Sequence, residues 1–152
     1  MGVATTKIGT VTEYIESYGR GGDGNSPTAD QWARILERPV TDPLTLINFF
    51  KFRTRADYGD AVDTDTSVTG AEAFNRYANV SIPTMERVGG QFLHVGPFAG
   101  SFIGADEDWD LVAIGAYPNL EALNALYSDA GYRAAFIHRS AACERQKVLI
   151  CA

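Results

Sequence analysis

The run from Trp109 to Arg139 constrains the fold of this chain more than any other part of it. It opens with an apolar, strand-forming segment, Trp109 to Tyr117, and turns through a Pro-Asn pair into a stretch whose leucines recur at helical spacing. A second helical stretch, from Gly131 to about Cys143, follows directly. A strand followed so closely by two helices indicates an α+β protein in which helices pack on a sheet.

The remaining segments complete a ferredoxin-like β-α-β-β-α-β pattern with a four-stranded antiparallel sheet. Leu44 to Phe52 is apolar at nearly every position, as expected of a strand that is covered on both faces. A capping box, Thr69 with Glu72, starts a helix that the Gly89-Gly90 pair ends. The predicted elements are strands at 44–52, 91–103, 109–117 and 147–151, helices at 69–88, 120–127 and 131–143, and a hairpin turn at 106–108.

Residues 1–40 are predicted to form an extension that packs on a single domain spanning residues 41–152. A helix at 27–38 has Thr28 and Gln31 in a capping box, and Ile8, Val11 and Ile15 fall at helical spacing before it. The extension is too short to hold a core alone. The glycine-rich loop between its helices lacks the GK[ST] of a phosphate cradle, so no phosphate site is expected there.

Composition and charge exclude several partners. The 152 residues carry a formal net charge of −6, which argues against nucleic acid and against an anionic membrane surface. No apolar run reaches the roughly 18 residues that a membrane span needs, and the start of the chain lacks the apolar segment of a signal peptide. A cytoplasmic location is therefore expected.

No metal site or redox centre is expected. Cys143 and Cys151 form no CxxC motif, and two reduced thiols are favoured over a disulfide or a redox role. The acidic loop at 54–68 contains Asp63, which begins like an EF-hand, but Val68 stands where glycine is needed and Phe74 where glutamate is needed. The length and charge of this loop raise the idea that it acts as a lid.

His94 and Arg139 are the candidate catalytic residues. Arg139 shares a helical stripe with Tyr132 and Phe136, so it should face inward, where a guanidinium needs a carboxylate, carbonyl groups or an anionic ligand. Asp110 is the predicted structural partner of Arg139, and anchoring a substrate anion is the alternative. His94 lies mid-strand, where it is either a general base or a hydrogen-bonded histidine of the sheet.

Five further side chains are candidates for lining a ligand cavity. An amide or aromatic ring at these positions either packs the core and bonds the main chain, or faces a flat, moderately apolar organic molecule. The candidate ligand-binding residues are Asn48, Tyr77, Trp109, Tyr117 and Tyr132.

Four segments together resemble the domain-of-unknown-function family 1330 of the dimeric α+β barrel superfamily. They are PLTLINFFKFR (43–53), TGAEAFNRYANVSIPTMERVGGQFLHVG (69–96), WDLVAIGAYPNLEAL (109–123) and GYRAAFIHRSAA (131–142). The resemblance implies a homodimer in which the sheets of two subunits pack together with the helices outside. The superfamily covers many activities, so the resemblance assigns no reaction.

These observations favour a small-molecule-binding protein that acts as a cofactor-independent enzyme of the isomerase, cyclase or monooxygenase type. Its substrate would be a small organic acid or aromatic compound, with Arg139 holding negative charge and His94 or a tyrosine moving a proton. No cofactor is expected. The alternative is a non-catalytic ligand-binding or stress-response dimer in which Arg139 and Asn48 are structural, and a third reading is a structural dimer without a cavity.

Overall fold

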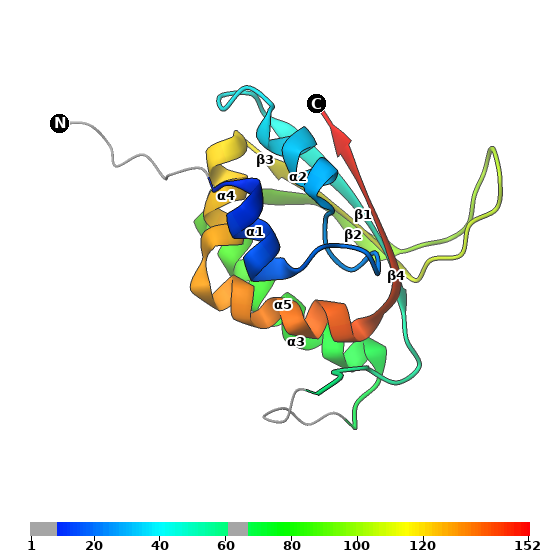
Figure 1. The fold of residues 1–152 in the computed structure, drawn as a ribbon. Coiled ribbons are helices and arrows are strands. Elements are labelled where there is room, and N and C mark those ends of the chain that lie inside the picture. Colours follow the sequence, from blue (N-terminus) through cyan, green and yellow to red (C-terminus); the bar gives the residue numbers. More distant parts are fainter. Residues whose placement is uncertain (1–8, 61–66) are drawn as a thin grey trace.

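A computed structural model of the chain describes residues 9–60 and 67–152. Four antiparallel strands form one sheet in the order β2-β3-β1-β4, and Figure 1 shows the helices gathered on one side of it. In chain order the elements are α1 (Val11–Tyr18), α2 (Ala29–Leu36), β1 (Leu44–Phe52), α3 (Gly70–Arg87), β2 (Gln91–Pro97), β3 (Leu111–Tyr117), α4 (Leu120–Ser128), α5 (Ala130–Ala142) and β4 (Cys143–Cys151). The predicted ferredoxin-like α+β fold is thereby confirmed.

Local signals placed several elements correctly. Strand β1 has the predicted bounds. The predicted capping boxes are both present, Thr28 with Gln31 before α2 and Thr69 with Glu72 before α3. Each box satisfies two backbone N–H groups that the first helical turn leaves without partners, so it fixes where the helix starts.

The predicted ends of two strands were wrong. Strand β2 stops at Pro97 and not at 103, and residues 98–110 form a long arm in place of a tight hairpin turn. Proline has no N–H to donate to the ladder, and Gly100 and Gly104 adopt positive φ angles that leave the strand conformation. Strand β4 begins at Cys143, four residues before the predicted start, because the chain passes from α5 into the sheet without a loop.

The two faces of the sheet carry different side chains. Residues paired directly across antiparallel strands lie on the same face, and His94, Ile114, Ile47 and Leu149 form one such row across all four strands. The next residue of β1, Asn48, lies on the opposite face, where the helices pack. The helices of one chain therefore cover only one face of β1, although its sequence predicts cover on both. The uncovered side is called the open face below.

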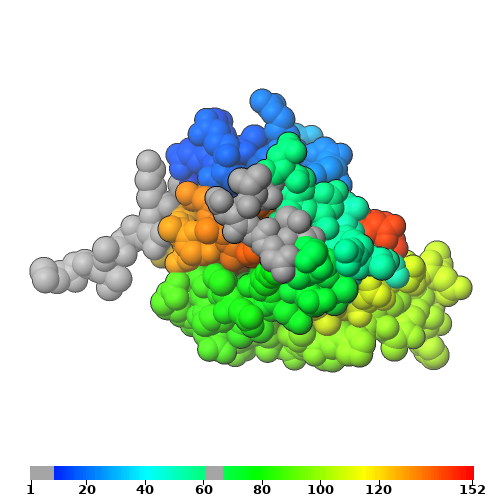
Figure 2. Space-filling model, turned by 90° about the horizontal axis from the view of Figure 1, so that it is seen from below, coloured from blue at the N-terminus to red at the C-terminus, as the bar shows by residue number. Residues whose placement is uncertain are grey.

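The N-terminal segment packs on α4 and α5. Tyr14 donates a hydrogen bond to Asn124 of α4, and the hydroxyl of Tyr18 donates to the carbonyl of Tyr127 at 2.6 Å. Figure 2 shows this segment, in blue, against the orange surface of α4 and α5, with the green surface of α3 on their other side. Tyr14 and Trp32 are buried in the same core as the sheet and the later helices. The domain division at residue 40 stays a prediction.

Asp63, Asp65 and the middle of the predicted lid segment 54–68 fall within residues 61–66, which lie outside the described residues. No helix in the described part of the chain is long and apolar enough to span a membrane.

Candidate functional site

Arg139 lies at the centre of the helix-covered side of the sheet. It is only 6% exposed, as the inward stripe of α5 predicts. Its guanidinium donates from Nε to Gln146 Oε1 at 2.8 Å, from Nη1 to the Tyr77 hydroxyl at 3.1 Å and from Nη2 to Asn48 Oδ1 at 3.4 Å. The rings of Phe50, Tyr77 and Phe136 surround it, with centroids 4.9 to 5.5 Å from Cζ. The prediction that Arg139 faces inward is confirmed, and its functional role stays a prediction.

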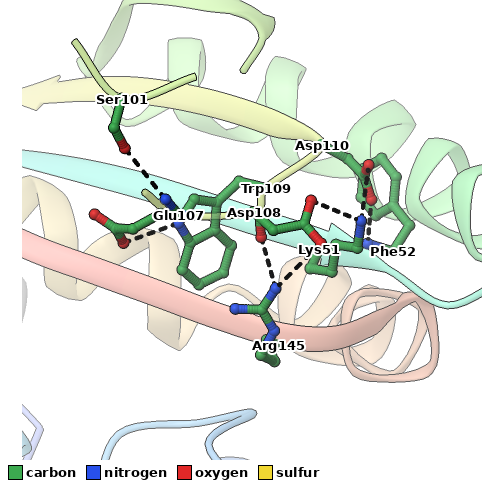
Figure 3. A network of polar contacts seen from close by, with 8 residues as sticks. All are labelled: Lys51, Phe52, Ser101, Glu107, Asp108, Trp109, Asp110 and Arg145. Carbon is green, nitrogen blue, oxygen red and sulfur yellow. Dashed lines mark hydrogen bonds and ion pairs between the residues drawn. The ribbon is translucent and has the colours of Figure 1, made fainter. Parts of the chain in front are cut away.

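The hydrogen-bond partners of Arg139 within residues 9–60 and 67–152 are all neutral, and the predicted pair with Asp110 was wrong. Asp110 lies 3.6 Å from Lys51 Nζ and accepts a hydrogen bond from the main-chain N–H of Phe52 at 2.8 Å (Figure 3). Among the described residues no carboxylate forms an ion pair with Arg139. A guanidinium has five N–H donors, and the three bonds above use three of them.

A cavity of about 500 Å³ opens beside Arg139, between the N-terminal segment and strand β4. Its walls are mainly apolar, and they include Trp32 and Ile35 of α2, Leu123 of α4 and Phe136 of α5. The described lining contains no aspartate, glutamate or histidine. Two further cations belong to the lining residues: Arg34, which is exposed, and Lys147, whose ammonium group pairs with Glu107. The cavity is therefore apolar with one buried positive charge, which suits an organic anion.

A smaller cavity of about 80 Å³ lies between the sheet and α3, and Arg139 borders it as well. Four of the five predicted ligand-binding residues line it: Asn48, Tyr77, Tyr117 and Tyr132. The hydroxyls of Tyr77 and Tyr132 are 2.7 Å apart, next to the guanidinium that Tyr77 accepts from. The structure thus brings these four residues together with Arg139.

Electrostatics keep this centre cationic. Burial by itself would lower the pKa of Arg139, but the nearby tyrosines Tyr77, Tyr132 and Tyr127 more than offset it and leave the pKa above its usual value. Burial raises the pKa of Tyr132 and of Tyr117 well above the ordinary range, so both hydroxyls stay protonated near neutral pH. The site offers a fixed positive charge and neutral hydroxyl donors.

His94 does not join Arg139. It lies on the exposed edge strand β2, in the row of the open face, whereas Arg139 lies on the helix side. The other histidine, His138, is half-buried at the far side of α5, where its Nδ1 lies 2.7 Å from the Tyr58 hydroxyl. Neither histidine lines the two cavities.

Trp109 also lies away from Arg139. Its ring stacks under the guanidinium of Arg145 at 4.7 Å and lies 5.7 Å from the ring of Phe49, and its Nε1 donates to Glu107 at 3.0 Å (Figure 3). These contacts anchor the base of the 98–110 arm across β1 and β4. The prediction that Trp109 lines the cavity is not supported in a single chain.

Three residues that border the larger cavity were not predicted from the sequence as part of the site: Gln146, Asn25 and Trp32. Gln146 holds Arg139 with its oxygen and donates from Nε2 to Asn25 Oδ1 at 3.1 Å, which ties the glycine-rich loop to the guanidinium. The predicted start of the last strand at Lys147 left Gln146 outside the sheet. The helical stripe of α2 did reveal Trp32 as buried, but nothing in the sequence placed it on the same cavity as Arg139.

Neither cysteine forms a disulfide in the structure. Cys143 is buried, which raises the pKa of its thiol to about 12, and Cys151 is exposed. A thiol with so high a pKa is a poor nucleophile near neutral pH. In the described ranges, no three histidine, cysteine or acidic side chains are grouped so that they could hold a metal ion.

Comparisons with known proteins identify relatives without an assigned reaction. The family model described as domain of unknown function (DUF1330) matches residues 64–152. The crystal structure of the RPA0582 protein of unknown function from Rhodopseudomonas palustris is 35% identical, with a TM-score of 0.73, and the match covers 83% of this chain and 93% of that one.

Two further solved structures are similar. The methylated RPA0582 protein matches at 35% identity and a TM-score of 0.74, over 83% of this chain and 91% of that chain. A dimeric protein of unknown function and ferredoxin-like fold from Bacteroides fragilis matches at 14% identity and a TM-score of 0.44, over 72% and 94% of the two chains. None of the curated proteins is similar enough in sequence to match the chain.

Proposed function

We propose that this chain, which belongs to the DUF1330 family of unknown function, binds a small organic acid, with the carboxylate of the ligand on Arg139. The observation that carries the proposal is that the buried guanidinium of Arg139 lies on the wall of a cavity of about 500 Å³. Its hydrogen-bond partners among the described residues are all neutral. Burying an unpaired charge is costly, and an anionic ligand would offset that cost.

The volume and walls limit the ligand to one of modest size. A cavity of this volume falls in the range of about 300 to 1,000 Å³ that small-molecule sites occupy. Apolar side chains such as Leu123 and Phe136 line it, so the body of the acid should be apolar. An aromatic or branched aliphatic acid fits this description better than a sugar or a nucleotide.

The test compares acids with their neutral analogues. Benzoate and phenylacetate, but not benzamide and phenylacetamide, should bind in isothermal titration calorimetry. Arg139→Met should remove this binding, since a charge-assisted hydrogen bond contributes about 1.5–3 kcal/mol. Arg55→Met, which removes an exposed arginine that lines neither cavity, is the matched control. Equal binding of acids and amides, or binding that survives Arg139→Met, would refute the proposal.

A catalytic role is a second candidate, favoured by the Tyr77–Tyr132 hydroxyl pair beside Arg139. Tyr77 and Tyr132 line the smaller cavity on the other side of Arg139, so the reacting part of the acid would have to reach that cavity. There, in an isomerisation, cyclisation or oxygenation, Tyr132 would supply a proton while Arg139 held the developing negative charge. His94 cannot take part from within the same chain, because it lies on the other face of the sheet. If Tyr132→Phe retains binding but stops a turnover that mass spectrometry detects, this role is supported. Unchanged turnover would refute it.

We also propose that two copies pair through the open face of the sheet. The support is the row of Ile114, Ile47 and Leu149 on a face that none of the described helices of the same chain covers. The arm beside it exposes Phe102 by 99% and Ile103 by 88%. A second copy with the same face would bury these side chains, as isologous pairing requires.

Native mass spectrometry tests the dimer. Wild-type protein and the Ile137→Lys control, which changes an exposed isoleucine on α5, should both be dimeric. Ile114→Lys, in the middle of the open face, should give monomers. A monomeric wild type, or a dimer that tolerates Ile114→Lys, would refute pairing through this face.

A further inference from the structure

Strand β4 leaves a row of main-chain hydrogen-bonding groups unpaired at one edge of the sheet. It is the last strand in the order β2-β3-β1-β4, and among the described strands it pairs with β1 alone (Figure 1). The carbonyl of Phe50 in β1 accepts from the N–H of Asp110, which leads into β3, at 2.8 Å. The N–H and C=O groups of a strand change side at each residue. Phe49 of β1 therefore faces β4, where it pairs with Lys147.

The residues of β4 that alternate with Lys147 turn their N–H and C=O groups away from β1. They are Gln146, Val148 and Ile150, and no loop or side chain among the described residues bonds these main-chain groups. This row is accessible, since Val148 is 40% exposed. An unpaired edge of this kind binds extended chains, because every second residue offers one donor and one acceptor.

The same row borders the cavity of about 500 Å³ that Arg139 lines. Gln146, Val148 and Ile150 all belong to its lining, together with Ile35 of α2. The side chain of Gln146 accepts from Arg139 Nε at 2.8 Å, so the guanidinium lies at the Gln146 end of the row. A strand advances about 3.3 Å per residue, which places Val148 and Ile150 about 7 and 13 Å further along β4. One cavity thus contains a buried cation and, beside it, an unpaired strand edge.

We infer that the ligand is an N-acyl derivative of an apolar amino acid, whose carboxylate binds Arg139 and whose amide pairs with the free edge of β4. One carbon atom separates the two groups in such a molecule, so an acid held by Arg139 presents its amide to the near part of the row, at Gln146 and Val148. The amide N–H donates to an edge carbonyl, and the acyl oxygen accepts from an edge N–H. The side chain of the amino acid packs on Leu123 and Phe136. This inference rests on the proposed function, because it assumes that an acid occupies the cavity.

Three acids with the same phenyl group test the inference in isothermal titration calorimetry. N-acetylphenylalanine has the amide, 2-acetoxy-3-phenylpropanoate has an ester in its place and so lacks the N–H, and 3-phenylpropanoate has neither group. The wild type should bind N-acetylphenylalanine about tenfold more tightly than 3-phenylpropanoate, equivalent to about 1.4 kcal/mol, with the ester in between. Equal affinities for the three acids would overturn the inference while acid binding through Arg139 stood.

Val148→Pro removes the middle donor of the row. The N–H of Val148 points away from β1, so proline at this edge position takes no bond from the ladder between the two strands. The variant should lose the preference for N-acetylphenylalanine and still bind 3-phenylpropanoate, which uses Arg139 and the apolar walls alone. If the preference survived in Val148→Pro, the edge of β4 would not be its source and the inference would fail.

Amide hydrogen exchange of the wild type keeps the test independent of how well this variant folds. In the free protein the amides of Gln146, Val148 and Ile150 should exchange fast. The amides of Lys147 and Leu149, which bond β1, should exchange slowly and are the internal control. Saturating N-acetylphenylalanine should slow exchange at Val148, and saturating 3-phenylpropanoate should not. Edge amides that are already slow in the free protein, or that both acids slow equally, would overturn the inference. If no acid binds at all, the proposed function fails first.

Discussion

Gln146 Oε1 lies 2.8 Å from Arg139 Nε, in the place that a carboxylate would take beside a buried guanidinium. Gln146→Glu should therefore supply an internal anion that competes with the ligand. We expect the affinity for benzoate or phenylacetate to fall about tenfold or more, equivalent to about 1.4 kcal/mol. Calorimetric titration measures the change.

Gln146→Leu is the matched control for this substitution. It removes the same amide and the same bonds to Arg139 and Asn25 without adding a charge, so it should retain most of the affinity. An equal loss in both variants would mean that the amide itself, and not competition for the guanidinium, governs binding.

The bond from Gln146 Nε2 to Asn25 Oδ1, at 3.1 Å, holds the glycine-rich loop against the cavity. Asn25→Ala should loosen this loop, because a side-chain hydrogen bond contributes about 1 kcal/mol. Hydrogen exchange of residues 19–27 should be faster, while exchange in β1 and α5 stays unchanged. Asn79→Ala, at an exposed position of α3, should leave the loop as it is. Unchanged exchange in Asn25→Ala would show that other contacts hold the loop.

Much of the fold could be predicted because its signals are local. The capping boxes at Thr28 and Thr69 fix helix starts through bonds that span three residues. The short apolar run predicts strand β1, and the helical periodicity of α5 predicts that Arg139 faces inward. These features depend on neighbours in sequence, and the structure agrees with them.

The arrangement of the site could not be predicted in the same way. Alternation tells which residues of a strand share a face, but not which face the helices cover, so His94 and Trp109 could not be separated from Arg139. A register irregularity between Phe92 and His94 makes the alternation of β2 harder still to follow. Asp110 was predicted to pair with Arg139, and only the tertiary structure brings Lys51 next to it.

Gly70 occupies a point where three segments of backbone meet, and sequence alone gives it no special role. Its N–H donates to the carbonyl of Arg53 at 3.1 Å, and the N–H of Arg53 donates to the carbonyl of Ala142 at 2.8 Å. A methyl group at Gly70 would overlap both of these carbonyl oxygens, which cannot move aside as a flexible side chain could. Gly70→Ala should lower the free energy of unfolding by about 3 kcal/mol in urea denaturation.

Gly131→Ala, in the first turn of α5, is the control for this substitution. Its added methyl group would meet only the Asp129 carboxylate, at 3.2 Å, and alanine favours the helix by up to about 1 kcal/mol. We expect the unfolding free energy of Gly131→Ala to change little. If both variants unfolded at the same urea concentration, the close approach at Gly70 would have no energetic consequence.

His138 should make the stability of the protein depend on pH. The Tyr58 hydroxyl accepts from Arg76 Nη1 at 3.1 Å and lies 2.7 Å from His138 Nδ1, so it donates to a neutral imidazole. Burial, and then the charge of Arg76, lower the pKa of His138 in the folded state. Between that value and the unfolded pKa of about 6.5, the unfolded chain binds more protons than the folded one. Stability should therefore fall as the pH drops through about 6.5, by at most about 1.4 kcal/mol per pH unit.

Urea denaturation at several pH values across this range measures the dependence of stability on pH. His138→Gln should lose this dependence and His94→Gln should keep it. An equal slope in His138→Gln and the wild type would assign the pH dependence to other groups.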